Sequence, residues 1–241
     1  MTLDFSIIVD NWQLFAKGAV LTLVIAFISI GIGFLLSIPV ALMALSHRWW
    51  LRWVSGAYVE WFRNVPFIVV VYIFFYGLPF AGVRLPEAVV GTLALAIYAS
   101  TYFSEVIRGA VLAVPKGQME AARAVGMSYF MGMREIVAPQ TLRLLLPPST
   151  NTSISMIKET SILSTITVAE ITYQGLVVQG ATFAPFEVFM TTAVLYWLIT
   201  SIFARFMHGI ERRAGIAQGG NQNRHSLADK YLQIGTKRVQ E

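Results

Sequence analysis

Residues 18–45 form an apolar run without a single charged side chain. A helix that crosses the hydrocarbon core of a bilayer needs about 20 such residues, and its backbone must satisfy its own hydrogen bonds there. The run therefore predicts a membrane-spanning helix. Its glycine pair, Gly31 and Gly33, is interpreted either as a point of close helix packing or as ordinary membrane-helix glycines.

The composition of the whole chain agrees with a membrane protein. Hydrophobic residues make up 56% of the 241 residues and charged residues 13%, against roughly 25% charged in a typical globular chain. The chain has no cysteine, which excludes disulfides and thiolate catalysis, and its histidines lack metal-binding spacing. The net charge of +5 arises from short basic segments between apolar ones. We therefore expect no metal, no cofactor and no nucleic acid.

Four more apolar segments follow the first, so the sequence predicts an all-α membrane protein with five transmembrane helices. Residues 1–17 are amphipathic and predict a short interfacial helix with Trp12 at headgroup level. Pro66 is expected to kink the second span near its start, and residues 171–186 are expected to form a loop. The spans are predicted at residues 18–45, 57–80, 87–113, 149–170 and 187–208.

The distribution of Lys and Arg predicts the orientation of these spans. Basic residues concentrate in the cytoplasmic segments of membrane proteins. In one of the two orientations only Lys17 and Arg84, of the 18 Lys and Arg, lie outside, while Lys158 lies within the membrane. That orientation puts the N-terminus outside, and the C-terminus and residues 115–139 in the cytoplasm.

The third span carries a polar stripe, which cannot face lipid at low cost and is expected to face protein or water. Glu105 and Arg108, three residues apart, either pair with each other or leave Glu105 free for a ligand. Glu60 and Arg63, near the start of the second span, have the same spacing and are expected to pair. The stripe, whose members share one face at helical spacing, comprises Tyr98, Thr101, Tyr102, Glu105 and Arg108.

The fourth span has a charged pair, Lys158 and Glu159, near its middle. A charge at the bilayer centre costs a few kcal/mol, so both side chains are expected to face the protein interior and to be paired. They either line a pathway, with Lys158 reaching a carboxylate and Glu159 an ammonium group, or form structural pairs such as Lys158 with Glu105. We favour the pathway. Glu170 and Glu187 are interpreted as solvated boundary residues rather than as a docking site.

Residues 115–139, which we call the knob, are the longest semi-polar stretch between apolar segments. The stretch holds Glu-Ala-Ala at residues 120–122, then Gly126 and Pro139. Helices can turn at a glycine and usually stop near a proline. The knob is therefore predicted to contain two short helices at an angle.

The spacing in the knob resembles the EAA motif of permease subunits of ABC importers. Glu-Ala-Ala is followed after three residues by Gly126 and after nine more by Ile136 to Pro139, with Ala138 in place of the usual leucine. The resemblance covers residues 15–213 and implies a type I permease fold for residues 1–213, with 214–241 as a polar, mobile cytoplasmic tail. Blocks similar to the histidine/glutamine/glutamate permeases lie at residues 60–66, 102–109, 115–123, 146–148 and 158–161.

The resemblance implies a permease subunit of a polar amino-acid importer in a bacterial inner membrane. The implied partners are a dimer of cytoplasmic ATPase subunits, a second permease subunit of the same or a similar chain, and an extracytoplasmic solute-binding protein. The chain has no G-x-x-x-x-G-K-[ST] phosphate loop. It is therefore expected to be no enzyme itself, and ATP hydrolysis would belong to the partner.

Two sets of functional residues are predicted. Relatives commonly have Asn-Ser where this chain has Tyr98-Ala99, which leaves the exact substrate open. The residues expected to couple the knob to the ATPase are Glu120, Ala121, Ala122, Gly126 and Pro139. The residues expected along the substrate pathway are Tyr98, Thr101, Tyr102, Glu105, Lys158 and Glu159.

Three other classes of membrane protein compete with the importer. A proton- or sodium-coupled secondary transporter would explain the intramembrane charges, but the chain shows no internal repeat and the knob would have no role. A scaffold or mechanosensory protein would leave Lys158 and Glu159 unexplained. A membrane enzyme would need a His/Asp/Ser or metal constellation, which the sequence does not present.

Overall fold

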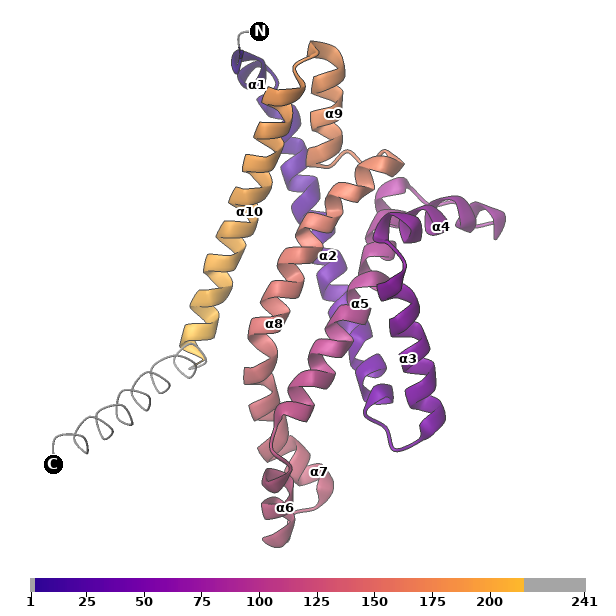
Figure 1. Cartoon of the computed structure of the whole chain (residues 1–241), viewed down its shortest axis with the longest axis vertical. Coiled ribbons are helices and arrows are strands. Elements are labelled where there is room, and N and C mark those ends of the chain that lie inside the picture. Colours follow the sequence, from indigo (N-terminus) through magenta and orange to yellow (C-terminus); the bar gives the residue numbers. More distant parts are fainter. Residues whose placement is uncertain (1–2, 215–241) are drawn as a thin grey trace, which may run out of the picture.

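The computed structural model describes residues 3–214, so the predicted tail at 214–241 lies, except for Ala214, outside the described residues. Residues 3–214 contain helices and connecting turns and no β-strand (Figure 1). The elements are α1 (Ser6–Asp10), α2 (Trp12–Ala44), α3 (Trp49–Asn64), α4 (Phe67–Phe80), α5 (Glu87–Ala113), α6 (Lys116–Ala124), α7 (Tyr129–Gly132), a π-helical turn (Met133–Val137), α8 (Ala138–Glu159), a 3-10 turn (Thr160–Ile166), α9 (Ile171–Thr182) and α10 (Pro185–Arg213).

Three helices, α2, α5 and α10, are individually long and apolar enough to cross a membrane. Two bent pairs bring the number to as many as five. One pair is α3 with α4, and the other is the segment Tyr129–Ile166 with α9. The all-helical membrane fold predicted from the sequence is therefore confirmed, and α5 has the bounds expected of the third span.

The second span is more sharply bent than predicted. Helices α3 and α4 meet at 102° rather than at a mild kink. Val65, between them, has φ −90° and ψ 129°, because the ring of Pro66 excludes the preceding residue from the helical conformation. Helix α3 also begins at Trp49, well before residue 57.

Two expectations about the ends of the spans were wrong. The loop expected at residues 171–186 is mostly helix α9, and Gly175, which suggested a loop, is buried where a Cβ would meet Thr192 Oγ1 at 2.9 Å. The interfacial helix expected over residues 1–17 is only the short α1, because α2 already begins at Trp12.

The two glutamates expected at a solvated boundary are buried instead. Glu170 has no exposed surface. Its carboxylate caps α9 by accepting hydrogen bonds from the backbone N–H groups of Thr172 (2.9 Å) and Tyr173 (2.8 Å), and it accepts a third from the Tyr196 hydroxyl (2.6 Å). Glu187 accepts one from the backbone N–H of Asp4 (3.1 Å). The two carboxylates thus fasten α9, α10 and the N-terminal segment together.

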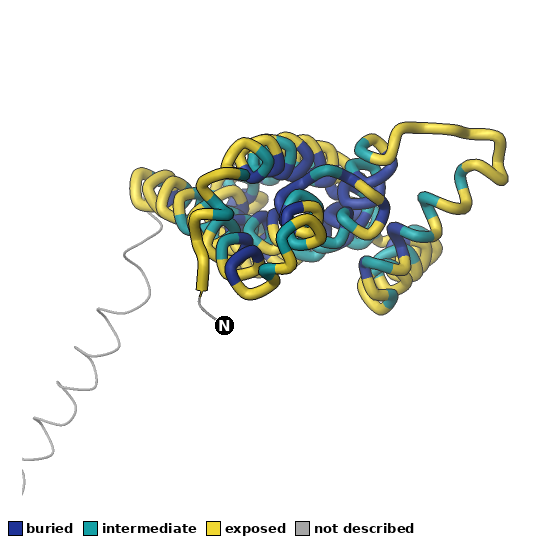
Figure 2. The backbone as a smooth tube through the Cα atoms, turned by 90° about the horizontal axis from the view of Figure 1, so that it is seen from above, coloured by how far each residue is buried: buried dark blue, intermediate teal, exposed yellow. Residues whose placement is uncertain are grey.

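Helices α2 and α5 cross against each other at the centre of the molecule (Figure 1). Figure 2 shows buried residues along the middle of the bundle and exposed residues on its outside. A Cβ on Gly33 would lie 2.8 Å from the Ala96 carbonyl oxygen and 2.9 Å from Ala99 Cβ, whereas one on Gly31 would meet nothing within 4 Å. Because lipid supplies no hydrophobic drive, membrane helices associate through such close contacts. Close packing is therefore confirmed for Gly33 and is absent at Gly31.

We expect Gly33→Ala to destabilise the protein, because the added methyl group must separate α2 from α5. Overpacking of this kind costs about 1–3 kcal/mol. Gly31→Ala is the matched control on the same helix and should leave stability nearly unchanged. Thermal unfolding of the purified variants in detergent measures the difference, and equal midpoints for Gly33→Ala and Gly31→Ala would show that the close approach is unimportant.

We also expect Glu170→Gln to lower stability more than Tyr196→Phe does. The amide loses a charged acceptor that serves two backbone N–H groups and a hydroxyl, while the phenylalanine removes only the hydroxyl. A buried hydrogen bond to a charged group contributes about 1.5–3 kcal/mol. The double variant should be less destabilised than the sum of the single changes, as measured by thermal unfolding. Strict additivity would contradict the shared hydrogen bond.

Candidate functional site

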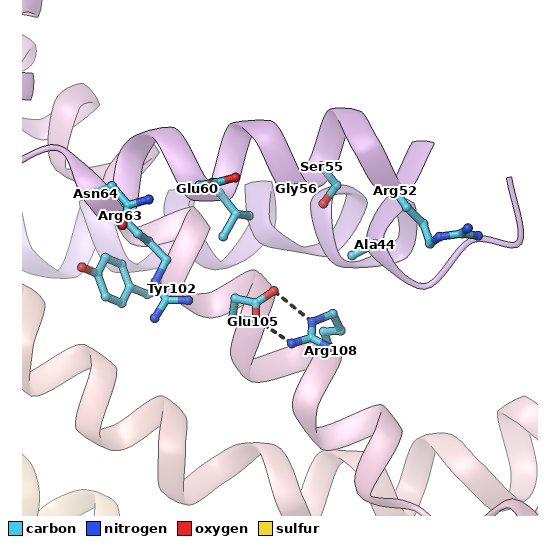
Figure 3. Close-up of a pocket in the computed structure, with 11 residues that line it drawn as sticks. Ala44, Arg52, Ser55, Gly56, Glu60, Arg63, Asn64, Tyr102, Glu105 and Arg108 are labelled. Atoms are coloured by element: carbon cyan, nitrogen blue, oxygen red, sulfur yellow. Dashed lines mark hydrogen bonds and ion pairs between the residues drawn. The ribbon is translucent and has the colours of Figure 1, made fainter. Parts of the chain in front are cut away.

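A cavity of about 610 Å³ opens between α3 and α5, beside the end of α2 at Ala44. Figure 3 shows side chains from both helices reaching into it. Most of its lining is polar, because α3 and the second half of α5 present charged groups toward each other. The polar and charged residues of the lining are Arg52, Ser55, Glu60, Arg63, Asn64, Tyr102, Glu105 and Arg108.

Glu105 and Arg108 form a two-pronged ion pair in this cavity. Arg108 donates from Nε to Glu105 Oε1 (2.9 Å) and from Nη2 to Oε2 (2.7 Å), as the dashed lines of Figure 3 show. Such a forked arrangement is the strong geometry for a guanidinium and a carboxylate. Of the alternatives open for Glu105, the local pair is therefore the one that forms, and a pair of Glu105 with Lys158 is not present.

Arg63 adopts a different arrangement from the one expected. Its guanidinium carbon lies 5.2 Å from the centre of the Tyr102 ring, a cation–π distance. The ion pairs among residues 3–214 include neither Arg63 nor Glu60. The predicted Glu60–Arg63 pair was therefore wrong. Arg63 extends across to α5 instead of folding back along its own helix.

The polar stripe of α5 divides between the cavity and the protein interior. Tyr102, Glu105 and Arg108 line the cavity. Tyr98 is buried behind Tyr102, and the two hydroxyls are 2.9 Å apart in a hydrogen bond. Thr101 is fully buried, and its hydroxyl donates to the Tyr98 carbonyl oxygen within the helix. Part of the polar stripe therefore lines the cavity, and the rest packs behind that lining.

Lys158 and Glu159 lie at the end of α8 and do not line this cavity. Lys158 is exposed on the single chain and Glu159 is half-buried. Neither has an ion-pair partner in the part of the chain that the structure describes. The structure therefore does not bring them together with Glu105, contrary to the expectation of buried and paired charges.

Sequence reasoning missed Arg63, Glu60 and Asn64 as cavity residues. All three lie in the block at residues 60–66, which was assigned only a local ion pair. Pro66 indicated that the helix ends there, and the last turn of a helix that ends at this point can pack against a neighbouring span. The direction of that turn depends on tertiary packing, which the sequence does not display.

The knob contains the predicted short helix, α6, and the predicted glycine turn, but its second helix is not short, because α7 continues through the π-helical turn into α8. Gly126 has a φ of +87°. The Gly126 N–H donates to the Arg123 carbonyl oxygen (3.0 Å), and the Met127 N–H donates to that of Ala122 (3.1 Å). These two bonds define a Schellman C-cap, in which glycine is favoured at the left-handed position. Ser128 then caps α7 by accepting from the Met131 N–H (3.2 Å).

The two helices of the knob pack closely through small residues. Ala122 is buried, and a Cβ on Gly132 would lie 3.3 Å from its Cβ and 2.9 Å from Met119 Sδ. Pro139 does not close a helix as expected. It stands directly after the π-helical turn, in the first turn of α8, so the helix runs past it instead of ending there.

The outer surface of the knob combines charge with exposed apolar side chains. Glu120, Ala121 and Pro139 are exposed. Contiguous exposed apolar residues mark interaction sites in proteins, and the knob lies at the end of the molecule far from the N-terminus (Figure 1). The exposed apolar side chains are Val125, Tyr129, Phe130 and Met131.

An all-helical membrane protein with a charged cavity between its spans and an exposed helical knob at one end belongs to the class of membrane transport subunits. Comparison with known families gives the particular one. Residues 33–216 match the family of binding-protein-dependent transport system inner membrane components, and the chain belongs to this family. It is thus a multi-pass inner-membrane permease subunit, a transport component and not an enzyme. The family implies ATPase and substrate-binding protein partners, and the resemblance drawn from the EAA-like knob is confirmed.

Relatives match nearly the whole chain. The probable glutamine ABC transporter permease protein GlnM of Bacillus subtilis (strain 168) is 35% identical over 211 residues, covering 88% of this chain and 98% of the relative. The octopine transport system permease protein OccM of Rhizobium meliloti is 40% identical over 212 residues, covering 83% and 86%. A crystal structure of an amino acid ABC transporter with histidines has a TM-score of 0.83 at 36% identity, covering 88% of this chain and all of that chain.

Proposed function

We propose that this permease subunit forms half of the pathway of an ABC importer for amino acids, paired with a second copy of itself or a homologous chain. Relatives named for glutamine and octopine transport support the substrate class. The observation that carries the proposal is the knob, because an EAA-like stretch folded as a rigid, exposed helical pair is a surface for a partner that supplies energy. The partner is a dimer of cytoplasmic ATPase subunits.

The proposed orientation has the N-terminus outside and the C-terminus in the cytoplasm. The bias of Lys and Arg supports it. The knob and the N-terminal segment lie at opposite ends of the molecule (Figure 1). A knob that contacts a cytoplasmic ATPase therefore puts the N-terminal end at the outer face, where the binding protein docks.

The coupling residues are assigned different roles by their exposure. Glu120 and Ala121 face outward and contact the ATPase, whereas Ala122 is buried and lets α6 lie close to α7. Gly126 sets the turn between the helices. Pro139 fixes the first turn of α8 and so the angle at which the knob joins the spans.

The proposed substrate pathway has two parts on this subunit. In the first part, Tyr102 and Glu105 line the cavity of Figure 3, and Tyr98 and Thr101 pack behind them. Lys158 and Glu159, at the end of α8, form the second part. Uncompensated charges on a membrane subunit are best explained by a polar pathway shared with the second permease.

Uptake by the reconstituted complex tests this function. Proteoliposomes containing the permease, the ATPase and the binding protein are given labelled L-glutamine, L-glutamate, L-arginine, L-histidine or octopine. We expect ATP-dependent, binding-protein-dependent uptake of at least one of these compounds, competed by its unlabelled form. Co-purification should recover the ATPase. Uptake driven by a proton or sodium gradient without ATP would instead indicate a secondary transporter.

We expect Gly126→Val to uncouple ATP hydrolysis from uptake, because a β-branched residue is strained at the left-handed position that ends α6. Gly126→Asn is the matched control, since asparagine tolerates this conformation. Both variants should insert normally. Gly126→Val should lose most of the binding-protein-stimulated ATPase rate and the co-purification of the ATPase, and Gly126→Asn should retain both. Full stimulation in Gly126→Val would refute the role of the turn.

We expect Glu105→Ala and Lys158→Ala each to lower the uptake rate by about tenfold or more. Glu105→Ala removes the partner of Arg108 in the cavity wall, and Lys158→Ala removes a charge from the other part of the proposed pathway; a lost charge-assisted contact is worth about 1.5–3 kcal/mol. Lys17→Ala removes an exposed lysine near the start of α2 that does not line the cavity, and it serves as the control. The unstimulated ATPase rate reports assembly and should be unchanged. Normal uptake in both pathway variants would mean that these charges are structural.

A further inference from the structure

We propose that Arg63 binds the α-carboxylate of the transported amino acid in the cavity between α3 and α5. This rests on the proposed function and deepens it, because it names the chemical group that the cavity recognises and the residue that does so. Such a site recognises the α-carboxylate of its ligand, a group that all amino acids share.

Arg63 is the cavity guanidinium without a protein partner among residues 3–214. Three guanidinium groups line the cavity. Arg108 is held by both carboxylate oxygens of Glu105. Arg52 donates to the backbone carbonyl oxygens of Ser46 and His47, at 3.0 and 2.9 Å, and so fastens the turn between α2 and α3. The hydrogen bonds and ion pairs of the described chain leave the N–H donors of Arg63 unused, and a guanidinium presents a fork that matches a carboxylate.

The Tyr102 ring holds Arg63 in place without using its hydrogen-bond donors. The guanidinium carbon lies 5.2 Å from the ring centre, and a guanidinium beside an aromatic ring keeps its N–H edges free. Arg63 belongs to the last turn of α3, directly before the bend at Pro66. Tyr102 is fixed in turn by its hydrogen bond to the buried Tyr98. The group is therefore pre-positioned, which lowers the entropy cost of binding.

The rest of the cavity fits a zwitterion rather than a simple anion. Glu60 lies one helical turn before Arg63, lines the same cavity and has no ion-pair partner among the described residues. The cavity therefore presents an unused cation and an unused anion beside the closed Glu105–Arg108 pair. The remaining lining consists of the small or apolar residues Ala44, Ser55, Gly56 and Val59 and the uncharged amide of Asn64, beside the Arg52 that is bound to backbone carbonyl oxygens. The volume of about 610 Å³ is in the range of small-molecule sites.

A comparison of ligands with and without the carboxylate charge tests the assignment. The complete permease–ATPase complex in nanodiscs, without binding protein, is titrated with each compound of the uptake panel and with its α-carboxamide. The wild-type complex should prefer the amino acid by about tenfold to a hundredfold. Arg63→Gln should reduce this preference to less than about threefold, through weaker binding of the amino acid alone. Arg63→Lys, which keeps the charge but loses the fork, should lie between them.

The control is Arg48→Gln, which removes an exposed guanidinium that precedes α3 and does not line the cavity. Its preference should equal that of the wild type. An undiminished preference in Arg63→Gln, or equal weakening of both ligands, would overturn the assignment. Uptake by a wild-type complex that shows no direct binding would overturn the site but leave the importer function standing. Absence of both uptake and binding would remove the proposed function itself.

Discussion

Every backbone group inside a bilayer must find its hydrogen-bond partner within the protein, because lipid offers none. This constraint explains why the described chain is helical, and it also shows where the helices are allowed to break. The break before α9 is tolerated because Glu170 supplies a buried cap and Val168 and Glu170 donate to carbonyl oxygens across it. The break at Pro66 loses no donor, since proline has no N–H. Both breaks are therefore compatible with a membrane, and they are the places where the chain changes direction within a span.

The cavity lies between α5 and the part of α3 that ends just before the bend at Pro66. Glu60 and Arg63 lie on one uninterrupted helix, α3, where a spacing of three residues makes them neighbours that could pair. Because α3 ends at Asn64 and α4 leaves at 102°, the last turn of α3 lies against α5, and Arg63 meets the Tyr102 ring. Glu60 and Arg63 are both exposed, and an exposed ion pair contributes little, so the cation–π contact with Tyr102 can compete with it. The tertiary contact therefore leaves the local pair unformed.

The sequence predicted those features that depend on local chemistry. The third span and the Gly126 turn follow from spacing within one segment and match the structure. The Glu105–Arg108 pair, one of the two arrangements that the spacing left open, is the one that forms. The features that it missed depend on contacts between segments. Gly175 suggested a loop because the sequence alone does not distinguish a glycine in a loop from a glycine at a close contact between helices. Glu170 looked solvated because its partner, Tyr196, lies in another helix. Neither Tyr102 over Arg63 nor the angle at Pro66 could be derived without the fold.

The cavity and the knob are joined by a short and stiff connection. Only Val114 and Pro115 separate the end of α5 from the start of α6, and Val114 is extended, as a residue before proline must be. The Schellman turn at Gly126 and the close contact of Ala122 with Gly132 hold α6 against α7. This connection joins α6 closely to α5, which carries Tyr102 and the Glu105–Arg108 pair. Arg63 sits on α3, which the chain joins to the knob only through α4 and α5, so the two walls of the cavity differ in how directly they are connected to the knob.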